Sequence, residues 1–188
     1  MACLNLLLDI RYKPENLYLA AGIIPGPKQP SLEKLNHYIH PLINDLLIAW
    51  ECGICFSKTA KFPDGWVTHS AIALVVCDLP AAHHLAALAG ISSHFFCSVC
   101  DCYHKNNYGR VDCEHWAPQD RDKLRFYAEQ WQDAVSSADR ERLFKDHGVC
   151  YLELWRLPYW DPTCQLVIDS MHCILEGLVQ HHICTLLG

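Results

Sequence analysis

The stretch Ala71-Ile-Ala-Leu-Val-Val-Cys-Asp78 is a run of seven apolar residues followed directly by an acid, and Cys97-Ser-Val-Cys100 begins 19 positions after that acid. A short, continuous apolar run is typical of a strand that is buried on both faces, as in a parallel or mixed sheet. An acid at the carboxyl end of such a strand stands where α/β sheets commonly place ligands and catalytic groups. The stretch therefore predicts an α/β domain with Asp78 at its functional edge.

The composition indicates an intracellular globular protein. The chain has 188 residues, of which 51% are hydrophobic and 19% charged, enough for one ordinary domain or slightly more. No apolar run reaches the roughly 18 residues that a membrane span requires, and the first residues lack the pattern of a secretion signal. We therefore expect neither secretion nor a membrane partner. The net charge of −6 argues against binding nucleic acid by simple electrostatics, but it is compatible with a core that binds DNA through divalent metals.

The expected elements alternate between strands and helices, which favours an α/β domain. In chain order we expect an apolar strand over residues 14–25, a long helix from Ser31, a buried strand over 67–77, a short helix over 79–90, an irregular segment from 92, charged helices over 121–147, a strand over 164–168 and a final helix over 169–187. Pro41 lies inside the long helix and should kink or split it.

Cysteine usage predicts a metal site. Twelve cysteines without a secretion signal indicate reduced thiols and metal ligands more than disulfides. Six potential ligands lie within 19 residues: Cys97, Cys100, Cys102, His104, Cys113 and His115. A structural zinc ion needs four ligands in a tetrahedron, and a Cys-x-x-Cys turn supplies two. We therefore expect a zinc site built on Cys97 and Cys100, completed by Cys113 and His115 or by a distant pair.

The last helix begins with Asp169-Ser-Met-His172. Asp169, His172 and Glu176 share one helical face, which could hold a metal ion. Asp169 could equally be the N-cap of that helix, as Asp78 could be for the helix that begins at Leu79. Two-metal phosphoryl transfer needs several clustered carboxylates, so Asp78 alone could not support it.

Six short elements together resemble the transposases of CACTA-type (En/Spm-like) DNA transposons, particularly the fungal branch. They are Ile23-Ile-Pro-Gly-Pro-Lys28, Pro41-Leu-Ile-Asn-Asp-Leu46, Cys77-Asp-Leu-Pro-Ala81, Phe96-Cys-Ser-Val-Cys100, Leu157-Pro-Tyr-Trp-Asp161 and Ile168-Asp-Ser-Met-His172. The resemblance covers nearly the whole chain, in the order that the family has.

The resemblance implies an RNase H-like core with a DDE triad of acids, two catalytic Mg²⁺ or Mn²⁺ ions, cleavage and transfer of DNA strands at transposon ends, and a nuclear location. By motif, Asp78 matches the family's second catalytic acid. Cys97 and Cys100 match its Cys-x-x-Cys, and His172 matches its Met-His. In related transposases these elements belong to a zinc-supported insertion, which makes His172 a candidate third zinc ligand.

Two acids of the triad have no clear match. The family's first Asp precedes the Pro-Gly-Pro segment, and Asp9 does not lie in that motif. The family's Glu is expected beyond the Met-His helix, and Glu176 is not at the motif position. We therefore interpret the chain as a truncated, inactive transposase. In this interpretation residues 1–91 are the middle of the RNase H-like core, 92–160 a Cys/His-rich and helical insertion, and 161–188 a final strand and helix of either part.

The sequence is also compatible with two other functions. The chain could be a non-catalytic, zinc-stabilised interaction or DNA-binding module that was domesticated from a transposase. It could also be a small independent metal-dependent hydrolase that uses Asp169, His172 and Glu176. A truncated core should expose apolar surface where the missing strands would pack, and it could form oligomers.

Overall fold

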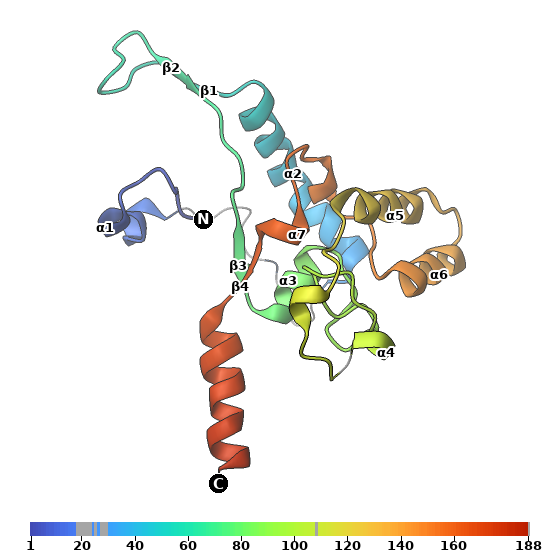
Figure 1. The fold of residues 1–188 in the computed structure, drawn as a ribbon. Coiled ribbons are helices and arrows are strands. Elements are labelled where there is room, and N and C mark those ends of the chain that lie inside the picture. The colour runs from blue at the N-terminus through green and yellow to red at the C-terminus, as the bar shows by residue number, and fades with distance from the viewer. Residues whose placement is uncertain (18–23, 25, 27–29, 108, 188) are drawn as a thin grey trace.

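The computed structural model describes residues 1–17, 24, 26, 30–107 and 109–187, and combines many helices with two small sheets (Figure 1). Its α-helices are α1 (Leu8–Arg11), α2 (Leu32–Glu51), α3 (Leu79–Leu85), α4 (His104–Asn107), α5 (Arg121–Asp133), α6 (Ser137–His147) and α7 (Pro162–Gln165). Its strands are β1 (Ile54–Phe56), β2 (Trp66–Thr68), β3 (Val75–Cys77) and β4 (Leu166–Ile168). The 3-10 helices are η1 (Pro14–Asn16), η2 (Cys113–His115) and η3 (Glu153–Arg156), and the π-helical segments are η4 (Met171–Val179) and η5 (His182–Leu186). This mixture is compatible with the expected α/β class.

The predicted long helix is present as α2, which begins directly after Ser31 and has 20 residues. It continues through Pro41, so the expected split does not occur. The ring of Pro41 lies on the exposed side, while Ile43 and Ala49 are buried on the other. Burial on the core side offsets the backbone hydrogen bond that a proline inside a helix cannot make. Gly53 ends the element with a φ of +77°, a conformation that glycine adopts without strain.

The main hydrophobic core lies between α2, α3, α5 and the segment over residues 149–160. Its largest fully buried side chains are Trp155, Trp160, Ile43, Leu152 and Leu157. The same cluster includes Leu35 in α2 and Leu166 in β4. The core therefore joins side chains from residues 1–91, 92–160 and 161–188, the three segments predicted from the sequence.

The apolar run over 71–77 does not form one long strand. Only Val75–Cys77 pairs, as β3, with β4 in parallel, whereas β2 belongs to a separate antiparallel hairpin with β1. Val76 is 57% exposed, so the expectation of burial on both faces was wrong. The reason is that α3 packs against β3 and β4, while the side chain of Val76 alternates to the opposite face.

The two ends of the chain differ from the body. Of the strand expected over 14–25, Pro14–Asn16 forms the 3-10 helix η1, and most of the remainder lies outside the described residues. The expected final helix is present as η4 and η5, which extend away from the body below β4 (Figure 1). Among the helices in the described ranges, none is both long and apolar enough to cross a membrane.

Candidate functional site

Two acids end two neighbouring strands. β3 and β4 run parallel, with Cys77 opposite Ile168, and the amide of Asp169 donates to the carbonyl of Cys77 at 2.8 Å. Asp78 and Asp169 therefore follow their strands at the same edge of the sheet. Because ligands bind at the carboxyl ends of parallel strands, this edge is the candidate functional site.

The pairing of these two acids was not anticipated from the sequence. A signal for it exists, since Val75-Val-Cys-Asp78 and Leu166-Val-Ile-Asp169 have the same pattern of three apolar residues and an acid. Two buried-type strands that each end in an acid would be expected to place those acids together if the strands are parallel and adjacent.

Both acids also accept hydrogen bonds from backbone amides where helical segments begin. Oδ1 of Asp78 accepts a hydrogen bond from the Ala81 amide at 2.7 Å and caps α3. The prediction that Asp78 could be the N-cap of this helix is thus confirmed. Oδ1 of Asp169 accepts from the Met171 amide at 3.0 Å, at the start of η4. Capping does not preclude metal binding, because each carboxylate has about four lone-pair sites.

His172 pairs with Asp169 through Nδ1 and Oδ2. This hydrogen bond lowers the pKa of Asp169 and is the main reason why the pKa of His172 is raised. The charges of Asp169, Glu176 and Asp78 raise the His172 pKa further. The three acids at this edge of the sheet thus favour the protonated form of His172.

The carboxylates are the natural ligands of a hard divalent cation such as Mg²⁺ or Mn²⁺. In the part of the chain that the structure describes, no group of three or more His, Cys, Asp or Glu side chains is placed to hold a metal ion. The site therefore offers a pair of carboxylates with a histidine beside them, and further ligands would have to come from water, substrate or additional protein groups.

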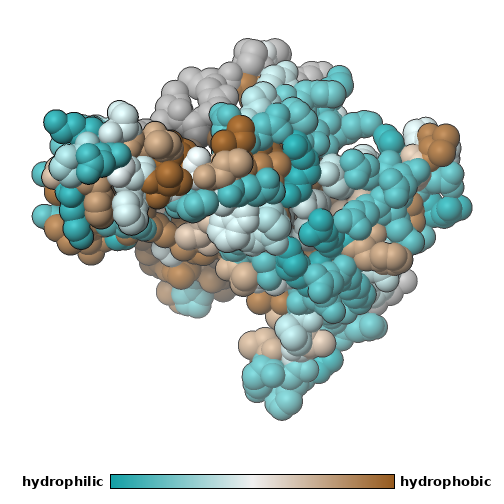
Figure 2. Space-filling view, turned by 90° about the horizontal axis from the view of Figure 1, so that it is seen from above, coloured by the Kyte–Doolittle hydropathy of each residue, from teal (hydrophilic) through white to brown (hydrophobic). Residues whose placement is uncertain are grey.

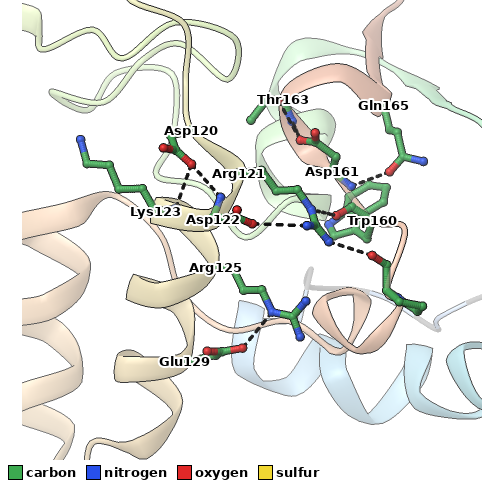
Figure 3. Close-up of polar contacts among 11 residues, drawn as sticks. Asp120, Arg121, Asp122, Lys123, Arg125, Glu129, Trp160, Asp161, Thr163 and Gln165 are labelled. Atoms are coloured by element: carbon green, nitrogen blue, oxygen red, sulfur yellow. Dashed lines mark hydrogen bonds and ion pairs between the residues drawn. The ribbon is translucent and has the colours of Figure 1, made fainter.

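Side-chain hydrogen bonds tie the turn Leu157-Pro-Tyr-Trp-Asp161 to α5 and α7 (Figure 3). Arg121, at the start of α5, donates from Nε to the Trp160 carbonyl at 2.7 Å and from Nη2 to the Pro158 carbonyl at 2.8 Å. The Asp161 amide donates to the side-chain oxygen of Gln165 at 2.6 Å. The element thus has a structural role, holding the residues that lead into β4.

Two further contacts position β4 beside β3. Gln165 Nε2 donates to the Ile72 carbonyl at 2.8 Å, which ties the residue before β4 to the segment before β3. Oδ1 of Asp161 accepts from the Thr163 amide at 2.9 Å and caps α7 (Figure 3). The bond between Gln165 and Ile72 supports the strand register that places Asp78 and Asp169 at the same edge.

The predicted zinc ligands Cys97 and Cys100 lie close together in an irregular loop. The Cys100 amide donates to Sγ of Cys97 at 3.3 Å. Burial, followed by the charge of Cys97, raises the pKa of the Cys100 thiol. Burial also raises the pKa of the Cys102 thiol to about 11.

The other candidate ligands are spread more widely. Cys113 and His115 lie on η2 and are exposed. Nδ1 of His115 is 3.8 Å from Oε1 of Glu114, and Sγ of Cys113 is 3.9 Å from Oε2 of the same residue. His172 is engaged with Asp169 at the sheet edge. The role of His172 as a zinc ligand stays a prediction.

Comparison of the chain with protein-family models, curated proteins and solved structures yields no match. The resemblance to CACTA-type transposases therefore rests on the sequence elements quoted above.

Proposed function

We propose that this chain is a transposase-derived protein that carries part of a metal-dependent core for DNA strand cleavage and transfer. The observation that supports this most directly is the parallel, in-register pairing of β3 and β4, which aligns Asp78 and Asp169 at one edge. Two-metal cleavage of a phosphodiester uses carboxylates that are gathered from neighbouring elements in this way. Asp78 and Asp169 would hold a divalent cation, which in an intact core would supply charge stabilisation for the cleaved phosphodiester.

The proposed protein binds metal but does not cut DNA by itself. A pair of carboxylates supplies two of the several oxygen ligands that Mg²⁺ or Mn²⁺ needs, and the third acid of a DDE triad has no assigned residue here. The net charge of −6 makes binding to DNA dependent on the metal, because bare carboxylates repel phosphate. In this proposal the protein acts in the nucleus, where transposon ends are its DNA partner.

The test uses Asp78→Asn, Asp169→Asn and the double variant. Asparagine caps a helix about as well as aspartate, so these changes remove charge and leave the capping function in place. Titration with Mn²⁺ should broaden the amide NMR signals around residues 76–78 and 167–170, and the double variant should lose that effect. Asp64→Asn, in the exposed loop of the β1–β2 hairpin, is the matched control and should behave as the wild type.

The DNA arm of the test measures binding of a fluorescent DNA duplex with and without Mn²⁺. We expect Mn²⁺-dependent binding that the double variant loses, and no nicking of supercoiled plasmid. Broadening that persists in the double variant would show that the metal binds elsewhere and would overturn the proposal. DNA binding that ignores both the metal and the two acids would overturn it as well. Nicking that requires Asp78 would contradict only the statement that the chain does not cut DNA, and would leave the proposed metal site in place.

A second candidate function, a non-catalytic interaction module, is favoured by the apolar surface of η4 and η5. Leu175, Leu178 and Leu187 are 60%, 67% and 72% exposed. Self-association in sedimentation velocity that is lost in Leu178→Glu and kept in the Asp78→Asn, Asp169→Asn double variant would favour this candidate.

A further inference from the structure

The C-terminal helical arm, formed by η4 and η5, is an exposed surface. Every residue from Ser170 to Leu187 is exposed, and the arm stands away from the rest of the ribbon (Figure 1). An isolated helix of this length is marginal in water, because most helical stability in proteins comes from packing of an apolar face. A partner that covers the arm would therefore stabilise it.

The arm carries an apolar ridge along one face. η4 and η5 are π-helical, with hydrogen bonds between residues five positions apart, so residues separated by four or five positions share a face. The exposed hydrophobic residues with this spacing are Ile174, Leu178, Val179 and Ile183, and they define the ridge. Three of them also line one shallow hollow beside His182, which places them on the same side of the arm.

The ridge is self-complementary. Its centre lies between Leu178 and Val179, and Ile174 precedes that point by as many positions as Ile183 follows it. Two antiparallel arms related by a twofold axis at this point place Ile174 of one copy level with Ile183 of the other. They also place Leu178 level with Val179. A twofold interface requires this property, because the same patch must face itself.

The charges of the arm favour an antiparallel over a parallel pair. Glu176 is the only acid between Ser170 and Leu187. A parallel pair would put Glu176 of one copy level with Glu176 of the other. The antiparallel pair puts it level with His181 instead, and it also opposes the two helix dipoles favourably.

The composition of the arm also separates a second copy from other classes of partner. The arm has no lysine or arginine, which a nucleic acid or an anionic membrane surface would require. Exposed apolar side chains flank the ridge at Met171, Leu175 and Leu186, so a pair of arms offers on the order of 1,000 Å² of buried area, the lower limit for a specific interface. Such a dimer is weak, so it forms at high protein concentration and the dilute chain is monomeric.

We propose that two copies of this chain form a twofold dimer in which their arms pack antiparallel along the ridge. The inference rests on the second candidate function, whose partner it identifies as a second copy of the chain. It does not depend on the metal site at Asp78 and Asp169. The two bodies lie at opposite ends of the paired arms, so neither obstructs the other.

The experiment is sedimentation velocity of the full chain over a range of concentrations, with a reducing agent present so that exposed cysteines do not cross-link the copies. We expect the wild type to pass from one chain to two as the concentration rises. Ile174→Lys and Ile183→Glu should each weaken association roughly tenfold or more, because each buries a charge against an apolar side chain. An equimolar mixture of the two variants should regain the dimer, since their opposite charges then lie level with each other.

The matched controls are Val135→Lys and Val111→Glu, which introduce the same charges at exposed apolar residues outside the arm. Both should associate as the wild type does, and circular dichroism of every variant checks that the fold is kept. A wild type that stays monomeric at every concentration would overturn the dimer, as would unchanged association of Ile174→Lys and Ile183→Glu. A mixture that stays monomeric would overturn the antiparallel register.

The Asp78→Asn, Asp169→Asn double variant separates the dimer from the metal site. It should associate as the wild type does, because asparagine keeps the helix starts intact and neither acid lies on the ridge. A chain that dimerises but does not bind Mn²⁺ would refute the proposed metal-dependent core alone. A chain that binds Mn²⁺ at the sheet edge and never dimerises would refute the dimer alone.

Discussion

The body of the molecule, which is built on α2, α3, α5 and residues 149–160, buries many of its apolar side chains. The C-terminal helical arm, formed by η4 and η5, exposes its apolar side chains instead. In the body, Leu157 is 0% exposed and Trp160 is equally inaccessible. In the arm, Leu178 is 67% exposed, and along one face of the molecule hydrophobic residues reach the surface at several places among hydrophilic ones (Figure 2). The same residue type therefore stabilises the fold in one region and contributes almost nothing in the other.

The two candidate acids lie where these regions meet. Asp78 and Asp169 follow strands that α3 covers on one side, while the next residues of the chain after Asp169 enter the exposed arm. A two-stranded sheet by itself is only marginally stable. The alignment of the acids consequently depends on the contacts that tie β4 to the body, above all those of Arg121, Asp161 and Gln165.

The largest expected difference between the regions comes from the same substitution made in each. Leu157→Ala should lower the free energy of unfolding by about 2–5 kcal/mol, because it removes buried methyl groups and leaves a cavity. Leu178→Ala should change it by no more than about 0.5 kcal/mol. Urea denaturation of both variants measures the contrast. Equal losses would show that the arm is packed in solution.

A smaller effect is expected from the contacts that join the two regions. Arg121→Ala removes two charge-assisted hydrogen bonds to the Trp160 and Pro158 carbonyls and should cost about 1.5–3 kcal/mol. Arg125→Ala, which removes an exposed pair with Glu129 on the same helix, should cost about 0.3–0.5 kcal/mol. If the two variants unfold at the same urea concentration, the anchoring role of Arg121 is wrong.

The smallest effect concerns the charges at the sheet edge. His172 has a raised pKa, so the stabilisation from this group is complete below its ordinary value of 6.5 and is lost as the pH rises through the folded-state value. Asp169 has a lowered pKa, so its stabilisation is present above the ordinary value of 3.8 and is lost as the pH falls through the folded-state value. The pair is therefore strongest between these two ordinary values.

An NMR titration of the His172 ring measures this directly. In the wild type the midpoint should lie above 6.5, and Asp169→Asn should lower it toward that value. Glu176→Gln should lower it less, since the hydrogen bond to Asp169 is the main cause of the shift. A midpoint that ignores Asp169→Asn would mean that the pair does not form in solution.

Local features of the fold were predictable from the sequence. The start of α2 after Ser31 and the end near Gly53 follow from capping and glycine preferences, although the Ser31 side chain makes no capping bond. Asp78 caps α3 as its position before Leu79-Pro80 suggests. The apolar run before Asp78 does end in a strand at that acid. These features depend on residues a few positions apart, so the sequence contains the information directly.

Long-range features required the tertiary structure. The run over 71–77 is too short a signal to reveal that only Val75–Cys77 would pair, or that Val76 would face outward. The continuity of α2 through Pro41 depends on the burial of Ile43 and Ala49 on the other side of the helix. The turn that anchors β4 depends on Arg121, which no local pattern connects to Trp160.

By itself, the sequence determined the chemistry available to this protein: two strands that each end in an acid, a cysteine-rich loop, and the helices between them. Only the tertiary structure decided that Asp78 and Asp169 share an edge and that Cys102 is buried. The physical reason is that helix caps and strand ends are set by neighbours in the chain. Pairing of Cys77 with Ile168, by contrast, is set by packing and hydrogen bonds between segments far apart in the sequence.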